Sequence, residues 1–226
     1  MGINRDRNYS AQDTVAGKRE DELVASYSEH DKEIIHKMIE EVNSKGYYIE
    51  YLFQLSWMDN DDFDSINPII MNYSLKLENT REKYGLISYL AVKGNIEATD
   101  FLLEQFRRQN DYIENLDWNF SRRGTCSSAL LVIKDKSKID KYIEIIENED
   151  TRQDSHFFIL LLGELKVTKS IPLLIELLNE DNIYLQSAAI QALTKFKKTV
   201  DLKPIISPFL SSDNDAVREY AKKALR

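Results

Sequence analysis

The C-terminal part of the chain repeats itself with a period of 31–32 residues. The clearest copy runs from Ser170 to Leu193, and a shift of 32 residues places it on 202–225. Such repetition is typical of stacked units, each of which buries its apolar face only against its neighbours. The matching positions are Pro172 with Pro204, Leu174 with Ile206, Leu177 and Leu178 with Phe209 and Leu210, Asp181 and Asn182 with Asp213 and Asn214, Ala189 with Ala221, and Ala192 and Leu193 with Ala224 and Leu225.

Each copy predicts two short amphipathic helices joined by a polar turn. In the first helix, apolar residues recur at helical spacing, and a proline falls in the first turn, where its missing N–H costs nothing. The turn offers Asp or Asn to cap the second helix, which carries small residues where two helices must approach closely. In the copy at 170–193 these features are Ile171, Leu174, Ile175 and Leu178, then Pro172, Asp181 and Asn182, and then Ala188, Ala189 and Ala192.

These residues resemble the HEAT repeat, in particular its short bacterial variety. The resemblance rests on the early proline, the Leu-Leu pair, the Asp-Asn turn, Val217-Arg218 and the Ala-rich second helix, and it covers 169–226 most fully. An earlier copy over 138–168 matches at shifts of 32 and 31 residues. The resemblance implies an all-α fold, a right-handed α-α superhelix of the HEAT/armadillo-like type. It transfers no catalytic residue, because HEAT proteins share none.

Upstream of 138, the repeats diverge but helical patterning continues. We expect a flexible tail over 1–20 and one helical-repeat domain over 21–226, with divergent repeats at 21–135 and clear repeats at 138–226. The whole domain would hold about six helical pairs. The predicted upstream helices are 31–43 and 46–58, 66–77 and 82–92, and 96–108 and 127–133, with an irregular stretch over 110–125.

The charge distribution favours a basic partner. The formal net charge is −8, and residues 20–64 alone hold 13 acidic side chains against Lys32, Lys37 and Lys45. An acidic field of this kind repels nucleic acid and attracts basic proteins, so nucleic acid is not the expected partner.

The stretch around 47–64 supplies candidate partner-binding residues. Its acidic run does not fit a calcium loop, because Ser65 and Met71 stand where an EF-hand starting at Asn60 needs Gly and Glu. Tyr and Trp are enriched in binding hot spots, although they also pack well in cores. The alternative for the acidic run is a solubilising loop between repeats. The candidates are Asp59, Asp61, Asp62 and Asp64, together with Trp57, Tyr48 and Tyr51.

No set of residues predicts catalysis, a cofactor or a metal centre. Glu33 and His36 form one Glu-x-x-His pair, but a di-metal site needs a second pair and further glutamates. None of the seven glycines forms a phosphate-binding loop. The single cysteine, Cys126, excludes an internal disulfide and fits a reducing compartment.

A nucleic-acid-binding or DNA-repair role is the alternative function. Arg122 and Arg123 follow Asp117-Trp118, and the C-terminal end is basic. Helical-repeat DNA glycosylases, which the chain resembles only in broad architecture, use Trp, Asp and Arg in a basic groove. The basic residues of the C-terminal end are Lys195, Lys197, Lys198, Lys203, Lys222, Lys223 and Arg226.

The function expected first is therefore a non-enzymatic protein-interaction module. Within that class, small acidic HEAT-like proteins of bacteria include candidates for immunity proteins, which neutralise a cognate toxin that is often a basic nuclease. We expect a bacterial protein, because the composition is low in Gly and rich in Lys, Ile and Asn. We expect it to be cytoplasmic, because the chain shows neither a membrane span nor an apolar signal segment. Polar residues at the last repeat, Arg218, Glu219, Lys222 and Lys223, would cap the stack and favour a monomer.

Overall fold

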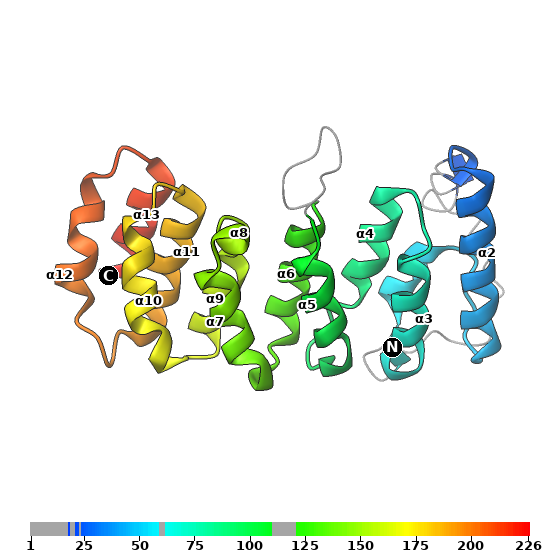
Figure 1. Cartoon of the computed structure of the whole chain (residues 1–226), viewed down its shortest axis with the longest axis horizontal. Coiled ribbons are helices and arrows are strands. Elements are labelled where there is room, and N and C mark those ends of the chain that lie inside the picture. The colour runs from blue at the N-terminus through cyan, green and yellow to red at the C-terminus, as the bar shows by residue number, and fades with distance from the viewer. Residues whose placement is uncertain (1–17, 19–20, 23, 59–61, 110–120) are drawn as a thin grey trace. The chain divides into compact units, whose positions relative to one another are not determined.

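The computed structural model describes residues 18, 21–22, 24–58, 62–109 and 121–226. All regular elements in these ranges are helices, which confirms the predicted all-α repeat fold. None of them is long and apolar enough to cross a membrane. The chain divides into two compact units, unit 1 (1–133) and unit 2 (134–226), and each is described by itself (Figure 1).

Unit 1 contains three helical pairs in its described part. The first members are α2, α3 and α5, and the second members are the 3-10 helix η2, α4 and α6. The second members form a row, since α4 contacts both η2 and α6. The bounds are α2 Glu29–Ser44, η2 Leu52–Trp57, α3 Phe63–Ser74, α4 Thr80–Tyr89, the 3-10 turn η4 Ile96–Ala98, α5 Thr99–Arg107 and α6 Arg122–Ile133.

Unit 2 contains three further pairs, α7 with α9, α10 with α11, and α12 with α13. Its second helices also form a row, because α11 packs on α9 and on α13. The bounds are η6 Lys136–Lys138, α7 Ile139–Glu147, α8 Glu149–Arg152, α9 His156–Glu164, η7 Thr168–Ser170, α10 Ile171–Glu176, η8 Leu177–Asn179, α11 Ile183–Leu193, η9 Thr194–Phe196, α12 Leu202–Ile206, η10 Ser207–Ser211 and α13 Asp215–Ala224.

Asparagine caps hold the turns between the paired helices of unit 2. The side chain of Asn182 accepts backbone N–H bonds from Tyr184 and Leu185, and Asn214 does the same at the start of α13. The Gln186 side chain then donates to the backbone oxygen of Leu178 at the end of the first helix (2.8 Å). Helix termini leave backbone groups without intrahelical partners, and these side chains satisfy them. The predicted capping function of the polar turn is confirmed.

Two buried polar contacts tie successive pairs together in unit 1. The carboxylate of Asp31 on α2 accepts the backbone N–H groups of Glu78 (2.8 Å) and Asn79 (2.9 Å), just before α4. The amide side chains of Asn67 and Asn95 donate to each other, at 2.7 and 3.1 Å. Buried polar groups cost free energy unless they are hydrogen-bonded, so these contacts fix how the pairs meet.

The predicted helix over 46–58 is wrong. Only Leu52–Trp57 is helical, and as a 3-10 helix. Side chains capture the backbone groups before it: Asn43 accepts the Ile49 N–H (2.8 Å) and donates to the Ile49 carbonyl (2.9 Å), while Gln54 accepts the N–H groups of Glu50 and Tyr51. Such bonds compete directly with α-helix formation. Helix α6, by contrast, begins at Arg122, five residues earlier than predicted.

The tightest contact of the second-helix row in unit 2 lies at Gly163. A Cβ atom built on this glycine would stand 2.6 Å from Cα and 2.9 Å from Cβ of Ala192. Helices α9 and α11 therefore approach closely, as the small residues of the repeat predict. Any larger side chain at either position would push the two helices apart.

We predict that Gly163→Ala lowers the free energy of unfolding by about 1–2 kcal/mol, because overpacking outweighs the gain in helix propensity. Gly85→Ala on α4 is the matched control, since a Cβ there meets nothing within 4 Å. The control should raise the free energy of unfolding by about 0.5–1 kcal/mol. Urea denaturation of both variants measures the difference, and a stabilised Gly163→Ala protein would contradict the close approach.

Candidate protein-binding surface

Large aromatic side chains are exposed along η2 and the segment before it. Tyr48 keeps 60% of its surface and Trp57 keeps 51%. Phe53 is half-buried, and its ring contacts that of Trp57 edge to face at 5.3 Å between centroids. We call Tyr48, Phe53 and Trp57 the aromatic edge of unit 1. Exposed aromatic side chains held by rigid neighbours are the residues that anchor protein interfaces most often.

Local hydrogen bonds set the position of this edge. The hydroxyl groups of Tyr47 and Ser65 lie 2.8 Å apart, and Ser65 also donates to the carbonyl of Asp62. The segment before η2 is thereby tied to the start of α3.

Tyr51 is not an exposed binding residue, which corrects the sequence-based assignment. It is buried, its hydroxyl donates to the Asp21 carboxylate (2.8 Å), and its ring stacks on Phe53 at 5.7 Å between centroids. Its partner Asp21 lies 30 residues away in the sequence, so helical spacing alone gave no indication of this burial. Tyr51 supports the aromatic edge through its ring contact with Phe53.

The acidic candidates are only partly placed. Asp59 and Asp61 lie outside the described residues, Asp62 is half-buried, and Asp64 is exposed on the first turn of α3. Asp64 is the predicted acidic residue that the described structure leaves most accessible, and it is close in sequence to the tie at Ser65.

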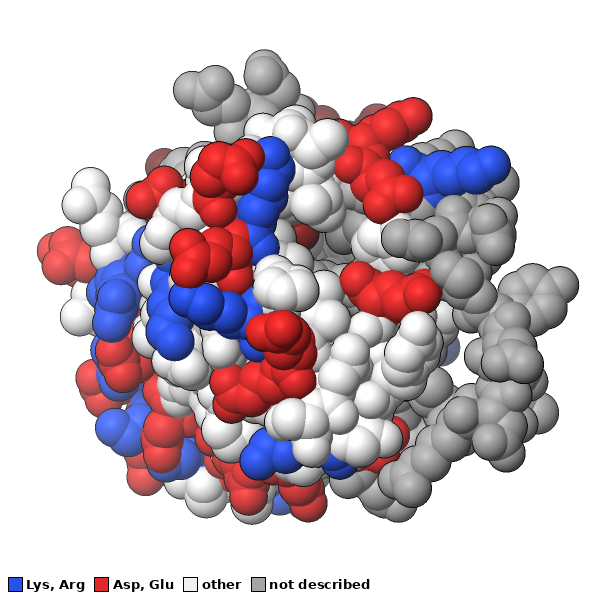
Figure 2. Space-filling model, turned by 90° about the vertical axis from the view of Figure 1, so that its right-hand side faces the viewer, with Lys and Arg blue, Asp and Glu red and all other residues white. Residues whose placement is uncertain are grey.

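Three acidic side chains of α2 contact basic side chains on the same helix. Lys32 pairs with Glu29 (2.8 Å), Lys37 with Glu33 (2.5 Å), and His36 with Glu40 (3.2 Å). The hydrogen bond from Lys37 holds the pKa of Glu33 below its usual value. Figure 2 accordingly shows basic and acidic groups interspersed on the face that carries α2. The count of 13 acidic side chains against three lysines already includes Lys32 and Lys37, so these pairs locate the compensating charge on α2 and leave the acidic excess of 20–64 unchanged.

The Glu33-His36 pair is engaged in these contacts with Lys37 and Glu40. Over the described ranges, no group of three or more His, Cys, Asp or Glu side chains is arranged to hold a metal ion. Asp117 and Trp118 lie outside the described residues.

Arg122 and Arg123 do not line an open basic surface. Both are half-buried at the start of α6. The Arg123 Nε donates to the Phe106 carbonyl (3.1 Å), and its guanidinium lies over the Phe106 ring at 5.6 Å from the centroid. Arg123 therefore closes the C-terminal end of α5. Its predicted role in partner binding stays a prediction.

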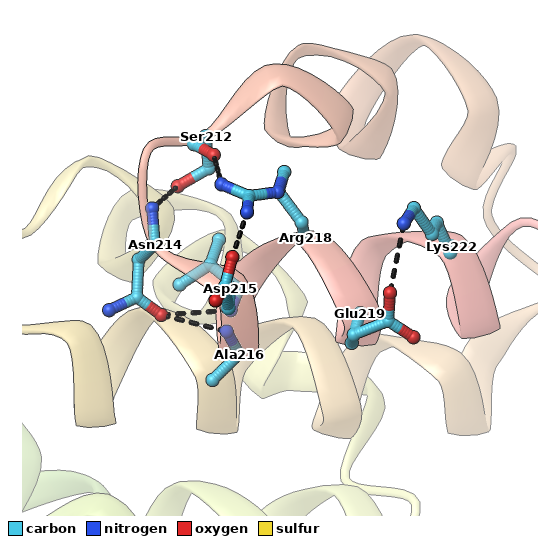
Figure 3. A network of polar contacts seen from close by, with 8 residues as sticks. Ser212, Asn214, Asp215, Ala216, Arg218, Glu219 and Lys222 are labelled. Carbon is cyan, nitrogen blue, oxygen red and sulfur yellow. Dashed lines mark hydrogen bonds and ion pairs between the residues drawn. The ribbon is translucent and has the colours of Figure 1, made fainter.

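The polar residues of the last repeat form a capping network (Figure 3). Arg218 reaches back to the carbonyl of Ser212 and to the carboxylate of Asp215, and Lys222 pairs with Glu219 at 2.9 Å. The bonds run within α13 and the turn before it. The Arg218 bond supplies a donor to the carbonyl of Ser212, the C-cap residue of η10. Whether these polar residues also keep the chain monomeric stays a prediction.

Comparison with known proteins supports the repeat assignment. The family model described as HEAT repeats matches residues 139–226. A designed armadillo repeat protein, YIII(Dq)4CqI, is similar in structure over 92% of this chain and 97% of its own, with 12% sequence identity and a TM-score of 0.46. No curated protein matches the chain.

Unit 2 contributes a second aromatic group, around a buried histidine. His156 at the start of α9 lies against the rings of Phe157 (4.0 Å between centroids) and Tyr184 (6.5 Å). Burial lowers the pKa of His156 to about 4, so the imidazole is neutral in the folded protein at pH 7.

We predict that His156 makes unit 2 sensitive to acid. The unfolded chain protonates this imidazole near pH 6.5 and the folded chain only near pH 4, so its stabilising contribution is complete above 6.5 and is lost as the pH falls toward 4. The loss amounts to about 3 kcal/mol of unfolding free energy at most. Urea denaturation between these two pH values measures the free energy of unfolding. This free energy should fall less steeply with decreasing pH in His156→Gln than in the wild type, while the variant retains Glu164 and the other carboxylates. Parallel curves for the two proteins would contradict the prediction.

Proposed function

We propose that the chain is a non-enzymatic module that binds another protein, because residues 139–226 match the family model of HEAT repeats. HEAT and armadillo repeats commonly mediate protein–protein interaction, and such scaffolds are generally without catalytic activity. We place the binding surface on unit 1, at the aromatic edge and the neighbouring start of α3. The exposure of Tyr48 and Trp57 is the observation that carries this proposal.

The chemistry of the edge suits a protein partner. Two large rings with half or more of their surface in water lose that exposure on binding, and Tyr and Trp dominate measured hot spots. Phe53 and the buried Tyr51 support Trp57 from within, so little side-chain freedom remains to be lost there. Polar groups at Glu50 and Asp64 would form the rim.

We propose further that the partner is basic. Asp59, Asp61, Asp62 and Asp64 follow Trp57 closely in the sequence, and no Lys or Arg lies between Lys45 and Lys76. Complementary charge speeds encounter and selects the partner more than it adds affinity. In its most specific form, the proposal is that the chain is a bacterial cytoplasmic immunity protein that neutralises a basic toxin.

The alternative, nucleic-acid binding through Arg122 and Arg123, receives less support. The contacts of Arg123 with Phe106 commit its side chain to holding α5. The part of that alternative that concerns the lysines of the C-terminal half is taken up below.

The first test is affinity capture from the lysate of the native host, treated with nuclease. We predict that the wild-type chain retains a basic protein, and that Tyr48→Ala combined with Trp57→Ala lowers the captured amount by about 30-fold, the effect of losing one hot-spot contact of about 2 kcal/mol. Ile183→Ala combined with Tyr184→Ala in unit 2 is the matched control, since these side chains are 41% and 52% exposed.

Equal capture by all three proteins, or a loss only in the unit 2 control, would refute a binding site at the aromatic edge. Disappearance of the captured protein on nuclease treatment would show that nucleic acid bridges the two.

The immunity proposal has its own test, which is growth of cells that express the captured protein. We predict that the partner alone stops growth, that co-expression of this chain restores it, and that the Tyr48→Ala/Trp57→Ala variant does not. A captured partner that is harmless by itself would end the immunity proposal and leave the binding proposal standing.

A further inference from the structure

In unit 2, basic and acidic residues lie in different turns of the repeat. Three segments lead from a second helix to the next first helix (134–141, 164–170 and 194–203), and they hold ten lysines against four carboxylates. The segments at the other ends of the helices (147–154, 176–182 and 211–215) hold nine carboxylates against Arg152 alone. The net charges are +6 and −8. We call the ten lysines the basic edge.

Ion pairs show that the lysine-rich segments lie side by side. The Glu164 carboxylate pairs with Lys195 of the next segment (2.6 Å) and with Lys134 of the preceding one (3.0 Å). Lys169 pairs with Asp140 in the same way, across one repeat. Figure 1 shows the turns that follow α9 and α11 at the same end of the unit. The basic edge is therefore one continuous surface along the stack, although its lysines are spread over 70 residues of sequence.

The four carboxylates of this edge have structural functions. Asp135 and Asp201 accept backbone N–H bonds at the starts of η6 and α12, while Glu164 and Asp140 link neighbouring turns. Most of the lysines, in contrast, are exposed. Within the described part of unit 2, those that form no ion pair include Lys136, Lys141, Lys166, Lys197, Lys198 and Lys203.

Two of the lysines occupy backbone positions that suit glycine better. Lys134 has φ +60° and directly follows α6, and Lys166 has φ +53° two residues after the end of α9. In unit 1, Gly94 lies in the same backbone region (φ +84°), in the segment between α4 and η4. A side chain in the left-handed region costs free energy that glycine avoids, so a lysine there suggests a use for its charge.

The basic edge has no apolar centre. The large apolar side chains that unit 2 exposes are Ile183, Tyr184 and Leu210, and none of them lies in the three lysine-rich segments. Stable protein interfaces bury an apolar core, whereas binding to nucleic acid can rest on cations alone. Exposed aromatics for stacking on unpaired bases are missing from these segments as well, which favours a duplex over a single strand.

We propose that the basic edge binds the phosphate backbone of duplex nucleic acid without reading its sequence. Lysine is a compact point charge that meets phosphate in many orientations, and all the cations of the edge are lysines. Successive pairs stack roughly 10 Å apart, so the edge extends over roughly 20 Å, a length of duplex with about 12 negative charges. The acidic segments at the opposite ends of the helices repel the duplex, so unit 2 faces it with the basic edge.

This site is independent of the aromatic edge, and it departs from the expectation, based on total charge, that nucleic acid is not a partner. Its test uses the full chain and a mixed-sequence DNA duplex of about 20 base pairs, with affinity measured by fluorescence anisotropy between about 50 and about 200 mM salt. The test variant is Lys166→Gln/Lys197→Gln/Lys198→Gln. The control, Lys45→Gln/Lys76→Gln/Lys93→Gln, removes three exposed lysines of unit 1 and the same charge.

We expect the wild-type chain to bind with a steep salt dependence. The test variant should bind about 10-fold or more weakly at low salt, with the slope of log affinity against log salt reduced by about 2–3, because each lost phosphate contact removes about 0.9. The control should bind like the wild type. A second variant, Lys166→Gly, should bind more weakly and yet melt at a higher temperature, which a purely structural lysine would not do.

Three results would overturn the proposal. They are an absence of wild-type binding at about 50 mM salt, an equal loss of affinity in both triple variants, and binding of a polyglutamate peptide as tightly as the duplex. The last result would assign the edge to acidic protein segments.

Discussion

The close approach of α9 and α11 at Gly163 and Ala192 is the contact on which the arrangement of unit 2 depends. Backbones that meet at this distance fix the register of one second helix against the next, so the turns at each end of the helices are aligned from repeat to repeat. Alignment brings residues about one repeat apart in the sequence into contact, such as Lys134 with Glu164 (30 positions) and Arg152 with Glu180 (28 positions). The surface chemistry of the unit follows from this packing, because a residue type that recurs at one repeat position becomes a continuous edge.

Sequence reasoning predicted the features that are local or that repeat. The helical pairs, the asparagine caps at Asn182 and Asn214 and the need for small residues near Ala192 all follow from spacing and side-chain chemistry.

The helix expected over 46–58 does not form, because the side chains of Asn43 and Gln54 hydrogen-bond to the backbone there. Helical periodicity carries no information about this competition. Tyr51 was misplaced for a similar reason, since its burial depends on a contact with Asp21. The lysines at 195–203 were recognised as a basic group, but their continuity with those at 134–141 and 164–170 was not, because charge was counted along the chain, where lysines and carboxylates nearly cancel. Counting by repeat position would have separated them.

The two units present surfaces of different chemistry. The aromatic edge of unit 1 offers large rings held by buried neighbours, and this combination suits a partner that can bury them. The basic edge of unit 2 offers flexible cations without apolar support, which suits a polyanion and little else. Neither surface requires a catalytic group, and the side chains with shifted pKa values have structural causes: burial for His156, and hydrogen bonds from Lys195 and Lys134 for Glu164. We propose that the function of this chain lies in what each edge binds.

The central claim is that a protein partner docks on the aromatic edge of unit 1. Hydrogen–deuterium exchange of the full chain, measured with and without its captured partner, tests it most directly, because it locates the contact without altering any residue. The account predicts slower exchange at residues 47–58 and at the start of α3 when the partner is bound, while the backbone of α9 and α11 exchanges as before. Protection confined to unit 2, with residues 47–58 unchanged, would contradict it.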